Sequence, residues 1–212
     1  MNTATNTATT AVKLGIFGSL ALLSIVWAPQ VAAQDEAQII DEVSVPAGSA
    51  AGSSGRIAVN IAAGDNNQQI GDAIIAIGDV AVVTEIVSQR MSGVSPTDHT
   101  TNITVGDGAF AGTNGLTSIN ITAGSQNQMA NLALLAIGNS GAMSDQLLEQ
   151  SRAPIEPKGG SPEGAVPAND HIAIGDAAFG DGSGLIQVNL IGGEGNSSAN
   201  TLALSITSEG SP

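Results

Sequence analysis

The chain has 212 residues, and its 19 acidic against 5 basic side chains give a formal net charge of −14. Such an acidic chain without clustered Lys and Arg argues against binding to nucleic acid or to anionic membrane surfaces. Aromatic residues make up 2%, Cys is absent and 42% of residues are hydrophobic, which excludes an aromatic-rich core, a disulfide framework and plain disorder. Small and β-branched residues, together with 27 Gly, suit thin layers packed flat on one another.

The first 33 residues are typical of a secretory signal peptide. Lys13 precedes an apolar run over 14–27, and the small residues at 31–33 match a cleavage site. The run is shorter than the about 20 residues that a comfortable membrane span needs. We therefore expect export and cleavage, followed by an N-terminal tail over 34–42, and keep a retained membrane anchor as the alternative.

Three copies of one segment follow, separated by two segments of different character. The copies span residues 43–78, 103–138 and 172–206, and they align without a gap. The intervening linkers, 79–102 and 139–171, collect Pro and most of the basic residues, whereas the repeats are nearly neutral. This division is expected of a chain in which some segments stack and others stay solvated. A short helix at the start of the first linker is also compatible with the pattern.

Strict alternation of apolar and polar residues predicts strands within each repeat. Gly64, Gly124 and Gly193 fall between two such strands, where a tight turn favours Gly. The apolar face is expected to build the core of each repeat. Its expected members are Ile57, Val59, Ile61, Ile119, Ile121, Val188 and Leu190 in the first strand, Ile77, Ile137 and Ile206 in the second, and Phe110 and Phe179 upstream.

A single repeat is a bent ribbon one strand high, so it can neither bury its apolar row nor pair its backbone. Stacking the copies in register at about 4.7–4.8 Å solves both problems. Carboxamides carry both a donor and an acceptor, so identical Asn and Gln can bond from layer to layer. The expected ladders are Asn60, Asn120 and Asn189, then Asn67, Asn127 and Asn196, and the pair Gln68 and Gln128. The predicted fold is all-β, a three-rung β-solenoid-like stack of parallel, in-register cross-β repeats with flexible linkers.

Only a short tail, 207–212, follows the third repeat, and we identify no capping segment in it. An uncapped stack leaves open edges that template the next molecule. We therefore expect self-assembly into a filament.

The motif Val-Asn-Ile-Ala-Ala-Gly-Asp-Asn-Asn-Gln-Gln at 59–69 resembles the repeat of the Fap functional-amyloid subunits, as does Ile-Asn-Ile-Thr-Ala-Gly-Ser-Gln-Asn-Gln at 119–128. The resemblance covers all three repeats. It implies export from a Gram-negative cell through the periplasm and a dedicated outer-membrane pore. It also implies a homopolymeric extracellular fibre that supports biofilm matrix and adhesion, with a related minor subunit and a periplasmic chaperone as partners. Major subunits of this family tend to end with a Cys-x-x-Cys pair, and this chain has no Cys. The choice between a major and a minor, nucleating subunit therefore stays open.

Catalysis, cofactor binding and metal binding are not expected. His99 and His171 each precede a repeat, and no clustered partners are visible in the sequence, so we interpret both as linker residues. The Gly- and Asp-rich run 180–184 fits an ordinary turn better than a calcium site. Asp107 and Asp176 occupy equivalent positions, where they either act as a pH brake on stacking or splay into solvent.

Two other functions remain open from the sequence. One is a monomeric secreted β-solenoid adhesin, which would need capped ends and a shaped outer surface. The other is an assembly or chaperone factor of the same fibre system, which would keep fibres from forming.

Overall fold

The computed structural model describes residues 39–92, 99–152 and 169–208, and in these residues every regular element is a β-strand. The predicted signal peptide, most of the N-terminal tail, residues 93–98 of the first linker, residues 153–168 of the second linker and residues 209–212 lie outside the described residues. The strands are β1 (Ile40–Val45), β2 (Ser54–Ala63), β3 (Gln68–Met91), β4 (Thr100–Val105), β5 (Asn114–Ala123), β6 (Gln128–Arg152), β7 (Asp170–Ile174), β8 (Ser183–Gly192) and β9 (Ser197–Thr207).

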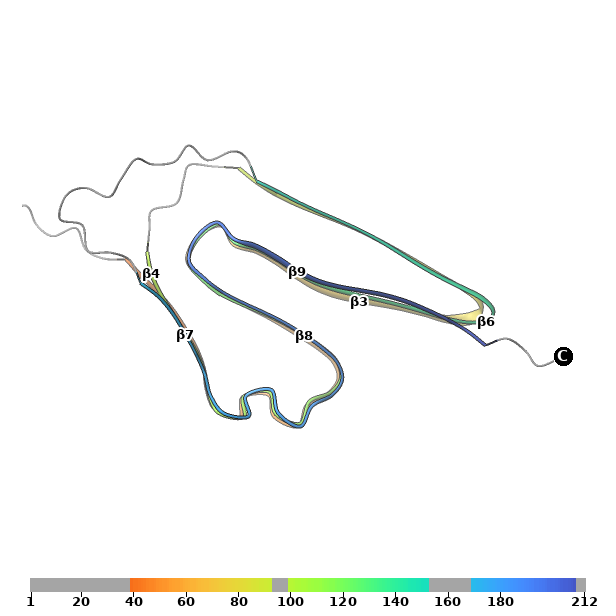
Figure 1. Cartoon of the computed structure of the whole chain (residues 1–212), viewed down its shortest axis with the longest axis horizontal. Coiled ribbons are helices and arrows are strands. Elements are labelled where there is room, and N and C mark those ends of the chain that lie inside the picture. Colours follow the sequence, from red (N-terminus) through yellow and green to blue (C-terminus); the bar gives the residue numbers. More distant parts are fainter. Residues whose placement is uncertain (1–38, 93–98, 153–168, 209–212) are drawn as a thin grey trace, which may run out of the picture. The chain divides into compact units, whose positions relative to one another are not determined.

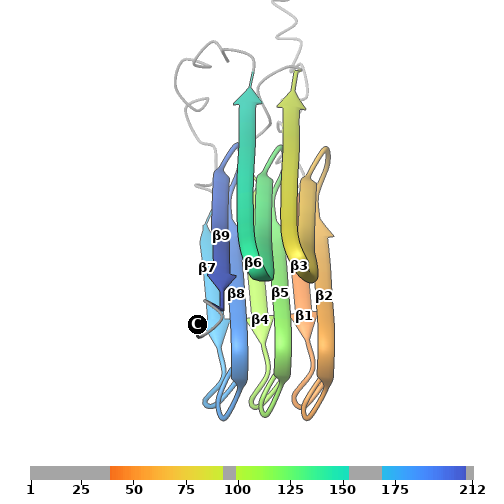
Figure 2. The same ribbon diagram turned by 90° about the vertical axis from the view of Figure 1, so that its right-hand side faces the viewer.

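The strands form three parallel sheets, with the orders β1-β4-β7, β2-β5-β8 and β3-β6-β9. Each sheet takes one strand from each repeat, so every repeat forms one layer and the second layer lies between the first and the third (Figure 2). Seen along the stack, the three layers trace the same bent path (Figure 1). Asn60, Asn120 and Asn189 fall in one row of the second sheet, as the gap-free alignment requires. The predicted all-β, in-register stack is confirmed.

Glycine permits the turn between the second and third sheets. Gly64, Gly124 and Gly193 have φ values of 93°, 111° and 90°, a region that side chains with a Cβ rarely adopt. The layers also approach closely here, because a Cβ on Gly124 would overlap the carbonyl oxygen of Gly193. The turn therefore needs Gly both for its backbone angle and for the layer above it.

The main apolar core lies between the first and second sheets. The middle layer supplies fully buried residues such as Ile119 and Ile121, while Val59 and Val188 of the outer layers are only partly buried. Phe110 joins this core and stacks on the ring of Phe179, with a centroid distance of 5.5 Å and an interplanar angle of 1°. Of the other expected core residues, Ile61 and Leu190 pack against the same cluster and Ile57 is partly buried.

The expected core positions in the third sheet are wrong: Ile77 and Ile137 lie in the middle of β3 and β6, and Ile206 lies near the end of β9. Ile77 is 75% exposed and Ile206 is 44% exposed, and Ile137 between them is only partly buried. The reason is geometric, because the third sheet extends beyond the bend where the second sheet turns away (Figure 1). Alternation correctly placed these residues on one face, but no second sheet covers that face here.

The linkers also differ from expectation, because their first halves are strand. After an irregularity between Gly78 and Val80, residues 80–91 (arm 1) pair in parallel with residues 141–152 (arm 2). A helix over 79–91 is therefore wrong. The arms are the second halves of β3 and β6 and run back along the first halves, 68–78 and 128–138 (Figure 1). Ala81 and Val83 pack with Leu134 and Ala136 in a second apolar cluster. Burial of this alternating apolar face favours strand over helix.

Candidate functional site: the stacking columns

The first expected column of Asn residues hydrogen-bonds from layer to layer. Asn120 Nδ2 donates to Asn60 Oδ1 at 2.9 Å, and Asn189 Nδ2 donates to Asn120 Oδ1 at 3.0 Å. Asn120 is fully buried in the middle layer, where an unpaired carboxamide would be destabilising by about 1–3 kcal/mol. The geometry therefore lets identical side chains satisfy one another along the stack. Their role in fibre assembly stays a prediction.

A second column of Asn lies beside the first, and the sequence analysis missed it. Asn131 Nδ2 donates to Asn120 Oδ1 at 3.0 Å, and Asn200 Nδ2 donates to Asn131 Oδ1 at 2.9 Å. The first layer has Gly71 at this position, where an added Cβ would stand 3.2 Å from the Cβ of Ser118. Asn at equivalent positions of two repeats was a visible signal, but the break at Gly71 hid the column.

The column of Asn67, Asn127 and Asn196 differs from the expected amide-to-amide ladder. Asn67 Nδ2 donates to the Gly124 carbonyl at 2.8 Å, while its Oδ1 accepts the Asn127 backbone N–H at 2.9 Å. Asn127 repeats this pattern toward the third layer, with the Gly193 carbonyl and the Asn196 N–H as partners at 2.9 Å each. These side chains sit at a tight turn, where the backbone of the next layer is closer than its side chain. Each carboxamide therefore clamps the following layer by its backbone.

Further amide contacts join the layers at the start of β3 and along the arms. Gln128 Nε2 donates to Gln68 Oε1 at 3.3 Å, and Ser197 takes the equivalent place in the third layer. In the arms, Gln150 Nε2 donates to Gln89 Oε1 at 2.7 Å. The arm contacts were missed because the two linkers share polarity at these positions without an obvious repeat motif.

One arm contact involves a buried carboxylate. Glu85 is 5% exposed, its Oε2 accepts a hydrogen bond from Gln146 at 2.9 Å, and its Oε1 has no partner among the described residues. Burial raises the pKa of Glu85 above its ordinary value of 4.5; the Gln146 bond opposes this shift and Asp72 adds to it. Among the described residues, Glu85 is thus the buried carboxylate that has one oxygen without a hydrogen-bond partner.

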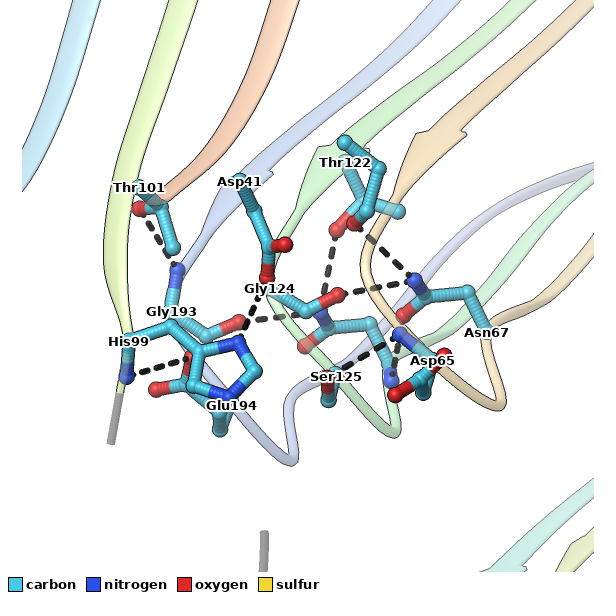
Figure 3. Close-up of polar contacts among 12 residues, drawn as sticks. Asp41, Asp65, Asn67, His99, Thr101, Thr122, Gly124, Ser125, Gly193 and Glu194 are labelled. Carbon is cyan, nitrogen blue, oxygen red and sulfur yellow. Dashed lines mark hydrogen bonds and ion pairs between the residues drawn. The ribbon is translucent and has the colours of Figure 1, made fainter. Parts of the chain in front are cut away.

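The two His residues have different environments. His171 is exposed, but it lies in β7 and pairs with Asn102, so it belongs to the third layer and its interpretation as a linker residue is wrong. His99 is 7% exposed, and its Nδ1 lies 2.8 Å from Oδ2 of Asp41. The His99 backbone N–H also donates to Oε1 of Glu194 at 3.3 Å (Figure 3). The expectation that no acidic partners cluster around His99 is therefore wrong.

The like-charged pair Asp107 and Asp176 lies at the surface, and both side chains are exposed. The turns that carry them pair through the backbone, with the Gly108 N–H donating to the Asp176 carbonyl at 3.2 Å. This arrangement leaves room for both carboxylates to point into solvent.

The outer layers carry the Asn60 and Asn67 columns of the middle layer but are covered from one side only. Asn120 is fully buried, whereas Asn60 is exposed. Asn196 is likewise exposed, although it occupies the position from which Asn67 and Asn127 clamp the next layer. The described part of the chain holds no helix long and apolar enough to cross a membrane.

The structure is that of a cross-β stacking protein. It combines repeated layers in register, amide columns that join them and end layers that are covered from one side only. The chain matches the Functional amyloid protein FapB/FapC family over residues 24–207, which is most of its length. It belongs to that family, a family of structural amyloid subunits rather than of enzymes. No solved structure matches the chain.

Proposed function

We propose that the chain is a secreted structural subunit that assembles with itself, end to end, into extracellular fibres that support the biofilm matrix and adhesion. The observation that carries the proposal is the match between the two end layers. In the second sheet, the third layer has Asn189 where the second layer has Asn120, and the first layer has Asn60 at the same position. The outer face of the third layer therefore matches the face that the second layer turns to the third, and the outer face of the first layer matches the face that the second layer turns to the first. A second copy placed on the third layer therefore continues the columns that begin at Asn60 and Asn67, whereas Gly71 of the next copy interrupts the column of Asn131 and Asn200.

The direction of the hydrogen bonds favours head-to-tail growth. Asn67 clamps the second layer and Asn127 clamps the third, always toward the later repeat. The exposed Asn196 is positioned to do the same to the turn at Gly64 of the next copy. Head-to-tail joining pairs two different faces, the third layer of one copy with the first layer of the next, and such a contact gives an open filament when it does not close into a ring.

Burial of the partly covered core supplies the driving force. Val59 and Val188 lie at equivalent positions of the two end layers, and each is only partly buried where Ile119 of the middle layer is fully buried. Stacking covers both end layers at once, and buried apolar area stabilises association by about 25 cal/mol per Å².

The route and partners of the proposed fibre follow from the family. Export through the periplasm of a Gram-negative cell, an outer-membrane pore, a periplasmic chaperone and a related minor subunit are proposed with it. The choice between major and minor subunit can be tested by asking whether the chain forms the bulk of the fibre or only seeds it.

Fibre diffraction of the purified chain after incubation tests assembly. The expected result is a meridional reflection at about 4.7–4.8 Å from strands perpendicular to the fibre axis. Preformed fibres should also shorten the lag phase when added in small amounts. A chain that stays a soluble monomer under these conditions contradicts the proposal and favours the monomeric adhesin. A chain that suppresses fibre growth by another subunit of the same system favours the assembly factor.

An end-layer variant tests the direction of growth. Asn196→Ala removes the carboxamide that would clamp the next copy while leaving the bonds within the chain between Asn67, Asn127 and their partners. Elongation on wild-type seeds should slow several-fold. Asn114→Ala is the matched control, because Asn114 is exposed and belongs to the middle layer. Equal elongation rates for the two variants would contradict head-to-tail clamping by Asn196.

A further inference from the structure

Three potential metal ligands from three different layers converge beside the turn at Gly124 (Figure 3). Asp41 belongs to β1 of the first layer, His99 immediately precedes β4 of the second, and Glu194 lies in the turn between β8 and β9 of the third. One ligand atom from each residue lies within 4.8 Å of the other two. Asp41 and His99 are both at most 9% exposed. The cluster is therefore a largely enclosed set of one imidazole nitrogen and two carboxylates.

The layers around the cluster leave space for these three side chains. A Cβ on Gly64 would lie 2.7 Å from Oδ2 of Asp41, and one on Gly124 would lie 3.3 Å from Oε1 of Glu194. The turn glycines thus make room for both carboxylates. The second layer carries small hydroxyl side chains, Thr101 and Ser125, where the outer layers carry carboxylates. The His99 ring occupies the resulting space at the level of the middle layer.

We propose that Asp41, His99 and Glu194 bind one divalent transition-metal ion of the Zn²⁺ class. Imidazole nitrogen and carboxylate oxygen are both ligands of zinc, and a water molecule can complete a tetrahedron around three protein ligands. Three donors at about 2.0–2.2 Å from a tetrahedral zinc ion stand about 3.3 Å apart. The distance from His99 Nδ1 to Asp41 Oδ2 is 2.8 Å, so these two side chains must move apart by about half an ångström to admit the ion. Small side-chain rotations bring Glu194 to the ion as well.

The chemistry of the ligands disfavours Ca²⁺ and Mg²⁺. Both ions prefer six or more oxygen ligands and take no imidazole in ordinary protein sites. The charges agree with a divalent ion, because two carboxylates balance a 2+ charge when His99 is neutral.

A bound ion would hold the three layers to one another. Its ligands are far apart in sequence, because His99 follows Asp41 by 58 positions and Glu194 follows His99 by 95. The unfolded chain therefore offers no preformed site, and metal binding stabilises the folded stack by mass action. Zinc should raise the midpoint of thermal unfolding, and a chelator should reverse the rise.

Cobalt binding to the full chain tests the site directly. Co²⁺ replaces Zn²⁺ and absorbs visible light when it is bound in a tetrahedral site. We expect saturation at one ion per chain, measured by equilibrium dialysis on both the soluble chain and its sedimented fibres. Asp41→Asn, His99→Asn and Glu194→Gln should each weaken binding on the order of 100-fold or more, because each removes a ligand directly. His99→Asn keeps a hydrogen-bond donor beside Asp41 and so separates metal binding from the existing contact.

Matched controls use residues that lie outside the cluster. His171→Asn removes the exposed His, and Asp65→Asn removes the acidic residue at the turn position of the first layer that corresponds to Glu194. Both should bind Co²⁺ as the wild type does. Circular dichroism checks that each variant keeps its β-structure, and Glu194→Gln decides the matter if the substitutions at the buried residues fail to fold.

Two results would overturn the proposal. A folded wild-type chain that binds no stoichiometric Co²⁺ or Zn²⁺ would identify the cluster as an ion pair between His99 and its carboxylates only. Unchanged affinity in His99→Asn and Glu194→Gln would place the metal elsewhere. Because metal content is measured per folded chain, these results are independent of whether the chain forms fibres.

Discussion

The repeats and the arms reach the same in-register pairing from different sequence information. In the repeats, one residue type recurs at the same position, so that Asn lies on Asn and Gly lies on Gly through all three layers. In the arms, the alternation is shared but most paired residues differ, as in Val80 with Gly141 and Glu85 with Gln146. The identical pairs there are Ala81 with Ala142 and Gln89 with Gln150.

The difference supports the proposal that the repeats, rather than the arms, stack on further copies. Three repeat layers each present the Asn60 and Asn67 columns, whereas the third strand of the last repeat ends at Thr207 without an equivalent of the arms in the described residues. The repeats can therefore continue through further copies. The arms stabilise the first two layers by covering one face of residues 68–78 and 128–138, the first halves of β3 and β6. Substitutions in the repeats should harm both folding and assembly, and substitutions in the arms should affect mainly stability.

Gly124→Val is expected to have the largest effect. The residue has a φ of 111° and a Cβ here would overlap the carbonyl oxygen of Gly193, so a β-branched side chain strains the backbone and separates two layers. The free energy of unfolding should fall by more than about 5 kcal/mol. Circular dichroism and fibre yield measure the loss. Gly141→Val in arm 2 is the control, since no atom lies within 4 Å of its added Cβ. Similar losses for both variants would show that the two regions tolerate side chains alike.

Asn120→Asp should be next in size. The substitution places a charge in a fully buried position and removes the Nδ2 donor to Asn60. The expected loss is about 4 kcal/mol at neutral pH, with a longer lag before fibre growth. Asn114→Asp, on the same strand but exposed, controls for the added charge. Unaltered fibrillation kinetics for Asn120→Asp would refute the ladder.

Phe110→Ala tests the aromatic pair in the main core. Phe110 is 2% exposed, so its truncation leaves a cavity and should lower the free energy of unfolding by about 3 kcal/mol. Phe179→Ala is the matched variant from the third layer and should have a smaller effect in the isolated chain, because Phe179 is only partly buried. Chemical unfolding compares the two. An equal loss would mean that the end layer is already as well covered as the middle one.

Glu85→Gln should produce the smallest effect, and it should be a gain. Burial raises the pKa of Glu85 in the folded chain above its ordinary value of 4.5, so the folded state holds a proton more tightly than the unfolded state. Wild-type stability therefore falls as pH rises from 4.5 through the raised pKa, and the full penalty is present above it. The neutral amide removes this penalty and should add about 1 kcal/mol at neutral pH.

Urea unfolding over a range of pH checks this sign. The advantage of Glu85→Gln should disappear below pH 4.5, where the wild-type carboxyl is protonated in both states. Glu149→Gln in arm 2 is the control, because Glu149 is exposed and its ion pair with Arg90 should contribute little. A gain that persists in acid would show that the amide acts through packing and not through ionisation.

The repeat columns could be predicted from the sequence because stacking needs little more than constant spacing. Once three segments align without a gap, parallel register follows, and residues such as Asn60, Asn120 and Asn189 must fall in one row. The same argument gave the turn glycines and the pairing of Phe110 with Phe179. The chain alone thus determined the layers and their order of contact.

Only the tertiary structure decided what lies between the sheets and beside the stack. The alternating residues of arm 1 form a buried face only because the arm folds back on the first half of β3. Ile77 stays exposed because the second sheet turns away before it reaches this residue. His99 meets Asp41 and Glu194 because three layers bring distant residues to one turn. Periodicity specifies which face a side chain points to, whereas its neighbours on that face depend on how the whole chain bends.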